Sequence, residues 1–150
     1  MVRRSLKRSD LENEPYLSWN TFVDLIALTD FEDLNEAQKP AHLIFWYDAE
    51  VYNGGHLQYF LNSAGRRASE TVEVLSKLDL SCQKTILADA IAFATRNPIP
   101  EIESTAEFVA VAFEGRFNEF DLRYAACPIQ LQDFLEQYLE QNFSEFIELI

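Results

Sequence analysis

The fold of this chain is decided by one segment, which reads Glu50-Val51-Tyr52-Asn53-Gly54-Gly55-His56-Leu57-Gln58-Tyr59-Phe60-Leu61-Asn62-Ser63-Ala64-Gly65. Two adjacent glycines follow an asparagine, so the backbone can turn sharply there with positive φ values. Amide side chains beside the turn can bond the backbone groups that a helix end leaves free. The segment therefore predicts a tight corner between two helices, held by a polar network. The residues expected to build this corner are Asn53, Gly54, Gly55, Gln58, Asn62 and Gly65.

Apolar residues with helical spacing continue on both sides of this corner. Residues 40–52 are apolar around almost the whole circumference of a helix, which predicts a buried central helix. A shorter helix is expected over residues 56–63, ending at Gly65. Other helices are expected near residues 19–27, 69–78, 81–94, 105–113, 117–124 and 128–139. We predict an all-α fold: a compact single domain of about seven or eight short helices over residues 16–150, after a flexible basic segment over residues 1–15.

The chain is strongly acidic, which restricts its partners. Its 150 residues carry 25 acids and 12 bases, a net charge of −13, and 48% of them are hydrophobic. Such a surface repels phosphate backbones and anionic lipids, so we expect no direct binding to nucleic acid and no membrane association. The uncharged stretch 40–47 is far shorter than the roughly 20 residues of a membrane span. Cationic protein partners and a cytoplasmic location are favoured.

The cysteines and histidines give little support for a metal or catalytic site. Cys82 and Cys127 are too few for a disulfide framework, and we expect each to be a small buried hydrophobe in a reducing cytoplasm. Together with His42 and His56 they lack the paired spacing of zinc ligands. We therefore expect no metal and no cofactor.

The segment 50–65 resembles the signature of the DNA mimic protein 19-like domains, small bacterial helical proteins mostly of unknown function. That signature reads Val-x-Asn-Gly-Gly-x-x-Gln-Tyr/Phe-Phe-x-Asn-x-x-Gly, and a later, weaker similarity lies in Phe117, Phe120, Asp121, Tyr124, Tyr138, Asn142 and Phe146. The resemblance spans about residues 38–146. It implies an all-α fold without a cofactor and leaves a homodimer open. The family takes its name from a member that imitates duplex DNA and occupies a DNA-binding protein.

Imitation of DNA requires carboxylates arranged on a surface like phosphates. Asp133, Glu136 and Glu140 lie at i, i+3 and i+7, so they share one helix face about 10 Å long. Glu145 extends this stripe, and no base follows Arg123. A second acidic set comprises Glu101, Glu103 and Glu107. The alternative interpretation is an acidic surface that only keeps the protein soluble.

These observations favour an acidic, non-enzymatic inhibitor that imitates DNA and occupies a basic DNA-binding protein. One alternative is an immunity or anti-defence protein that binds a toxin or nuclease through an apolar anchor ringed by acids. A further alternative is an enzyme with its site near His56, where Asp48 or Glu50 would complete an acid/base pair.

Overall fold

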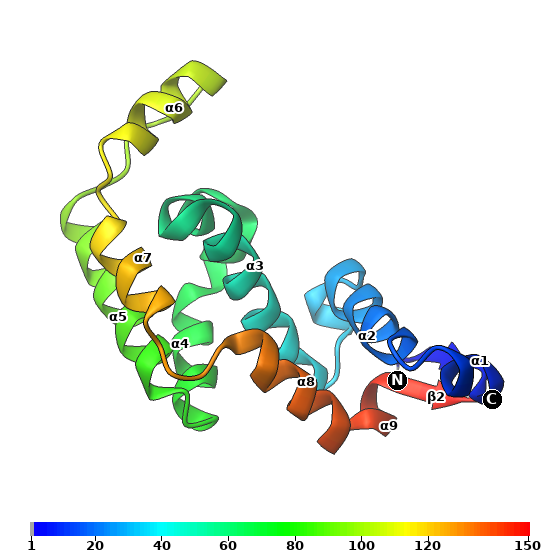
Figure 1. Ribbon diagram of the computed structural model, residues 1–150. Helices are drawn as coiled ribbons and strands as arrows, with labels where there is room; N and C mark the ends of the chain where they lie inside the picture. Colours follow the sequence, from blue (N-terminus) through cyan, green and yellow to red (C-terminus); the bar gives the residue numbers. More distant parts are fainter. Residues whose placement is uncertain (1) are drawn as a thin grey trace. The chain divides into compact units, whose positions relative to one another are not determined.

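The computed structural model describes residues 2–150 and confirms the all-α fold class (Figure 1). Its described residues form nine α-helices, two short 3₁₀ helices and two three-residue strands. They divide into two units. The terminal unit holds the chain up to Trp46 together with Ile129–Ile150, and the central unit holds Tyr47–Pro128. The long helix α3 (Gln38–Leu61) contributes to both units.

The terminal unit is built on helices α2 and α8. Its elements are β1 (Arg4–Leu6), α1 (Arg8–Asn13), α2 (Leu17–Leu28), η1 (Phe31–Asp33), the start of α3, α8 (Leu131–Gln141), α9 (Phe143–Phe146) and β2 (Ile147–Leu149). The apolar face of α8 is buried at Leu131, Leu135 and Leu139, as its spacing predicts. Phe22 of α2 meets Phe146 edge to face at 4.8 Å between ring centroids, and both side chains are fully buried.

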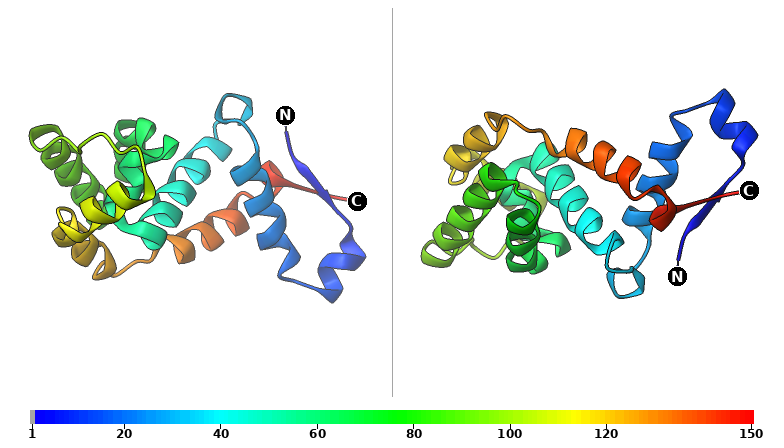
Figure 2. Two further views of the ribbon diagram at one scale, coloured as in Figure 1. Left: turned by 90° about the horizontal axis from the view of Figure 1, so that it is seen from above. Right: turned by 90° about the horizontal axis from the view of Figure 1, so that it is seen from below.

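The two ends of the chain pair with each other, which the sequence did not predict. Strand β1 runs parallel to β2, with Leu6 opposite Leu149, where a flexible segment over residues 1–15 was expected (Figure 2). Buried Gln38 fixes this pairing, because its side-chain amide donates to the backbone carbonyls of Val2 and Glu145 at 2.6 and 2.7 Å. Pairing between residues so far apart in sequence leaves no local pattern.

The basic residues of this first segment turn back onto acids of the same unit. Arg4 pairs with Asp24 at 2.7 Å, and Arg3 pairs with Glu148 at 3.7 Å. Part of the amino-terminal positive charge is therefore neutralised within the terminal unit.

The central unit surrounds the second half of α3. Its further elements are η2 (Ser63–Arg67), α4 (Ala68–Lys77), α5 (Ser81–Arg96), α6 (Thr105–Phe113) and α7 (Asn118–Ala125). Helices α4 and α5 pack together across a tight turn at Asp79, which has a φ of 58°. Their inward side chains include the fully buried Leu75 and Leu87. The sequence predicted α4, α5, α6 and α7, with ends within a few residues of those observed, but not η2.

The expectation of free cysteines is wrong, because Cys82 and Cys127 form a disulfide. Their Cα atoms are 5.9 Å apart, which joins the start of α5 to the segment after α7. A spacing of 45 residues between two cysteines does not reveal whether they meet in space. The pairing also removes both thiolates from any zinc site, and the cytoplasmic location stays a prediction.

We expect the disulfide to stabilise the fold mainly by restricting the unfolded chain. For a loop of this length the chain-entropy estimate is about 4 kcal/mol, and measured values are commonly about 2–4 kcal/mol. Reductant should therefore lower the midpoint of urea unfolding of the wild-type protein. The double variant Cys82→Ser/Cys127→Ser should show the same lowered midpoint with and without reductant. A midpoint unchanged by reductant would contradict a stabilising role.

Candidate functional site

The Asn-Gly-Gly corner lies inside α3 and confirms the predicted break between two helices. Gly54 has φ −151° and ψ 22°, and Gly55 has φ 69° and ψ −174°, neither of which is helical. The conformation of Gly55 is one that essentially only glycine adopts. A side chain there would also collide with the carboxylate of Asp121 on α7. Two helical segments can therefore meet at this point only because the residue is glycine.

Glu50 is the centre of the polar network on one side of the corner. Its Oε2 accepts hydrogen bonds from Gln58 Nε2 and Asn62 Nδ2, both at 2.7 Å. Asn53 Nδ2 in turn donates to Gln58 Oε1 at 3.2 Å. The polar network predicted for these amides exists, but they bind a buried carboxylate instead of free backbone groups. This network joins the two segments of α3 across the kink.

Gly65, in contrast, is not the end of a helix. The second segment of α3 ends at Leu61, and Gly65 lies within η2. There it packs so closely on the backbone of Tyr59 that a side chain would not fit.

His56 lies on the other side of the corner and is fully buried. Its Nδ1 is 2.7 Å from Asp121 Oδ1, and its Nε2 is 2.8 Å from the hydroxyl of Tyr47. Its backbone N–H donates to the same Asp121 oxygen at 2.9 Å. A neutral ring satisfies both contacts, with Nδ1 donating to the carboxylate and Nε2 accepting from the tyrosine.

The expected pairing of His56 with Asp48 or Glu50 is wrong. Asp48 accepts a hydrogen bond from the hydroxyl of Tyr124, and Glu50 binds the two amides described above. Sequence reasoning missed Asp121 as the partner of His56, although the weaker similarity at Asp121 and Tyr124 marked both residues. Both residues of α7 contact the corner, as does the ring of Phe120 beside His56.

Tyr47, His56 and Asp121 form a hydrogen-bonded series like that of a nucleophile, a base and an orienting acid. The environment of this series opposes catalysis. Tyr47 is fully buried, and this burial raises the pKa of its hydroxyl well above 10, an effect that nearby Tyr59, Asp121 and Asp48 reinforce. The phenol therefore stays neutral and out of reach of a substrate. The set is a structural network.

The predicted acidic stripe occupies one exposed face of α8. Asp133, Glu136 and Glu140 are all exposed, opposite the buried leucines of the same helix. Glu145 is half-buried, and its carboxylate accepts a hydrogen bond from Asn35 Nδ2 at 3.1 Å. It is therefore less available to a partner than the other three acids.

The second acidic set lies at the start of α6 in the central unit, and its three residues are exposed. Ser104 caps the helix by accepting from the backbone N–H of Glu107 at 3.2 Å, and Glu107 accepts from the N–H of Glu103 at 2.7 Å. Glu107 thus serves a capping arrangement as well as the acidic surface. Glu101 and Glu103 keep their carboxylates toward solvent.

Neither a metal site nor a membrane-spanning helix is found among residues 2–150. No three His, Cys, Asp or Glu side chains gather there in a group that can hold a metal ion. No helix in this part of the chain combines the length and apolar character that a membrane crossing requires.

The fold and the corner define a small acidic helical protein whose most distinctive residues form a buried polar network. The family model of the DMP19-like proteins matches residues 32–142, and the chain belongs to this family. The DMP19-like family is not a known enzyme family. Comparison with curated proteins and with solved structures finds no match.

We expect Gly55→Ala to lower the free energy of unfolding by about 3 kcal/mol, because it combines a forbidden backbone conformation with a collision at Asp121. Gly115→Ala is the matched control. Gly115 also has a positive φ, of 63°, but faces only the flexible side chain of Asn118, so about 1 kcal/mol is expected. Urea unfolding measures both variants, and equal losses would contradict a special role for the Gly55–Asp121 contact.

We expect stability to fall in alkali because of Tyr59. Burial raises the pKa of this hydroxyl from 10 to about 12, while its hydrogen bond to Thr71 acts in the opposite direction. The neutral phenol is favoured in the folded state, so this stabilisation is complete below pH 10 and is lost as the pH rises toward 12. Tyr59 should contribute about 2–3 kcal/mol to this loss, measured as the difference between the wild type and Tyr59→Phe in urea unfolding across this range. Tyr59→Phe should show a shallower decline, and an identical decline would contradict the assignment.

Proposed function

We propose that this protein is a non-enzymatic inhibitor that binds a basic DNA-binding protein in the place of DNA. The observation that carries this proposal is the exposed acidic face of α8, which presents Asp133, Glu136 and Glu140 in one row. Membership of the DMP19-like family supports it, since the family is named after a DNA mimic.

The spacing of this row is compatible with part of a phosphate backbone. At about 1.5 Å per residue, its three carboxylates are separated by about 4.5 and 6 Å along the helix axis. One DNA strand carries a phosphate about every 3.4 Å along its axis. The row therefore offers about two-thirds of the linear charge density of a single strand. Additional acids, such as Glu145, would be needed to imitate a longer stretch.

The proposed interaction is electrostatic in its approach and in its salt dependence. The segment Pro128–Ile150 contains five acids and no base, so no cation on this segment opposes a basic partner. Lysine and arginine side chains that normally bind phosphates would pair with the carboxylates of α8. Attraction between the α8 carboxylates and the partner's positive charges would accelerate association. The same attraction would weaken as the salt concentration rises.

The first experiment is capture of proteins from host lysate on the immobilised chain at low salt, with duplex DNA as competitor. Retention of a DNA-binding protein that the duplex releases supports the proposal. A retained partner that DNA does not displace favours the immunity or anti-defence alternative. Failure to retain any DNA-binding protein contradicts the proposal. A gel-shift control with labelled duplex should show no binding to the chain itself.

We expect Asp133→Asn/Glu136→Gln/Glu140→Gln to weaken binding to the captured DNA-binding protein by about tenfold or more at low salt, and to reduce its salt dependence. The matched control removes the same charge from exposed positions elsewhere, as Glu12→Gln/Glu14→Gln/Glu73→Gln. A biosensor titration across salt concentrations compares the two. Equal losses in both triple variants would mean that only total charge matters.

A further inference from the structure

Helix α6 carries an apolar stripe that is exposed to solvent. Ala106, Val109, Ala110 and Phe113 lie at i, i+3, i+4 and i+7, and all four are exposed. Phe113 is 87% exposed and Val109 is 44% exposed. Isolated exposed apolar residues are ordinary, but a continuous stripe along one helix face marks an interaction surface. Within the central unit, α6 also stands apart from α4, α5 and α7 (Figure 1).

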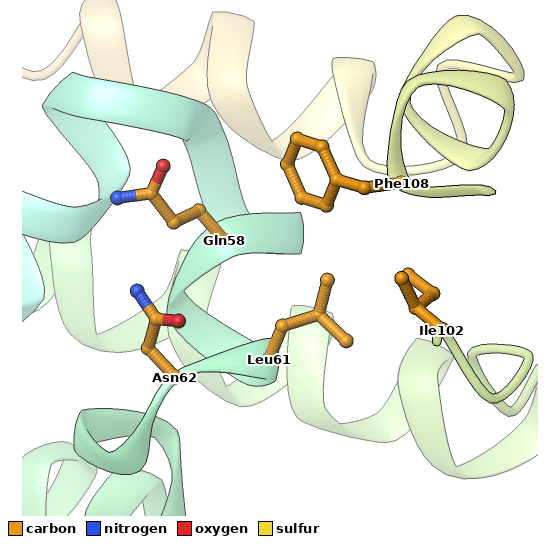
Figure 3. Close-up of a pocket in the computed structure, with 5 residues that line it drawn as sticks. All are labelled: Gln58, Leu61, Asn62, Ile102 and Phe108. Atoms are coloured by element: carbon orange, nitrogen blue, oxygen red, sulfur yellow. The ribbon is translucent and has the colours of Figure 1, made fainter. Parts of the chain in front are cut away.

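The opposite face of α6 holds the helix in place. Val111 is buried, and Phe108 turns inward toward Leu61 and Ile102. Phe108, Leu61 and Ile102 line a pocket of about 420 Å³ together with Gln58 and Asn62 (Figure 3). The Ser104 cap fixes the first turn. The stripe is therefore presented by an anchored helix.

The charge around the stripe distinguishes between possible partners. Residues 97–115 contain four acids and no base. Glu114 is paired with Arg116 at 2.9 Å, whereas Glu101 and Glu103 are exposed at the start of the helix. A second copy of this chain carries the same net charge of −13 and would be repelled. A partner surface that carries positive charge beside an apolar strip would complement both the apolar stripe of α6 and the acids near it.

We propose that α6 docks against a basic amphipathic helix of a partner protein. Phe113 and Val109 would pack on the apolar side of that helix, while Glu101 and Glu103 would attract the lysines or arginines that flank it. The inference rests on the proposed function only for the positive charge of the partner. It assigns an apolar docking surface to the central unit, separate from the acidic face of α8 in the terminal unit.

The test uses a fluorescent synthetic helix with leucine on one face and lysine on the other, titrated with the full chain by anisotropy. We expect Val109→Ser/Phe113→Ser to weaken binding about tenfold without changing any charge. Leu122→Ser is the matched control, because Leu122 is 73% exposed on α7 outside the stripe, and it should bind like the wild type. A peptide with glutamate in place of lysine should bind far more weakly. Thermal unfolding checks that each variant remains folded.

Two results would overturn the inference. One is equal affinity of the wild type and Val109→Ser/Phe113→Ser for the basic peptide. The other is a dimer, seen by light scattering, that this double variant converts to a monomer, because the stripe would then be covered by a second copy.

Failure of the proposed function is distinguishable from failure of this inference. If the double variant captures the DNA-displaced partner as well as the wild type does, the α6 inference fails while the proposed function stands. If the stripe binds the basic peptide and no DNA-binding protein is ever captured, the proposed function fails while the α6 inference stands.

Discussion

The central unit depends on one carboxylate oxygen, Asp121 Oδ1, which accepts from both the backbone N–H and the ring of His56. The two contacts are possible because Gly55 adopts a conformation that leaves room for Asp121 beside the backbone. They hold α7 against the corner of α3, and the bond from Tyr124 to Asp48 adds a second attachment about one turn further along α7. With both ring nitrogens of His56 satisfied, a buried polar group is accommodated without an unmet hydrogen bond.

Much of this arrangement could be predicted from sequence because it is local. Helical periodicity marks the faces that α2, α5 and α8 bury, and an Asn-Gly-Gly run can hardly continue a helix. The amides of Gln58 and Asn62 lie within about three turns of Glu50, so a network among them was foreseeable. The identity of its central acceptor was not, because a glutamate on an apolar helix looks like an ordinary exposed residue until its burial is known.

Most of the features that sequence reasoning missed join distant segments. The β1–β2 pairing connects the two ends of the chain, and the disulfide closes a loop between Cys82 and Cys127. Asp121 entered the sequence analysis only through the weaker family similarity, since nothing in its neighbourhood identifies a histidine 65 positions earlier as its partner. Periodicity gives the face that a helix buries but not the element that it meets. Such contacts follow only from the three-dimensional arrangement.

The signature segment 50–65 and the residues proposed to bind a partner belong to different parts of the structure. The signature residues Asn53, Gln58 and Asn62 contact other side chains of the central unit and shape the corner. The acids of α8 and the stripe of α6 face solvent, where substitution costs little stability. A relative can therefore keep the signature and the fold while it changes these surfaces. Under the proposed function, the choice of partner would then be set by the exposed faces of α6 and α8 and not by the corner.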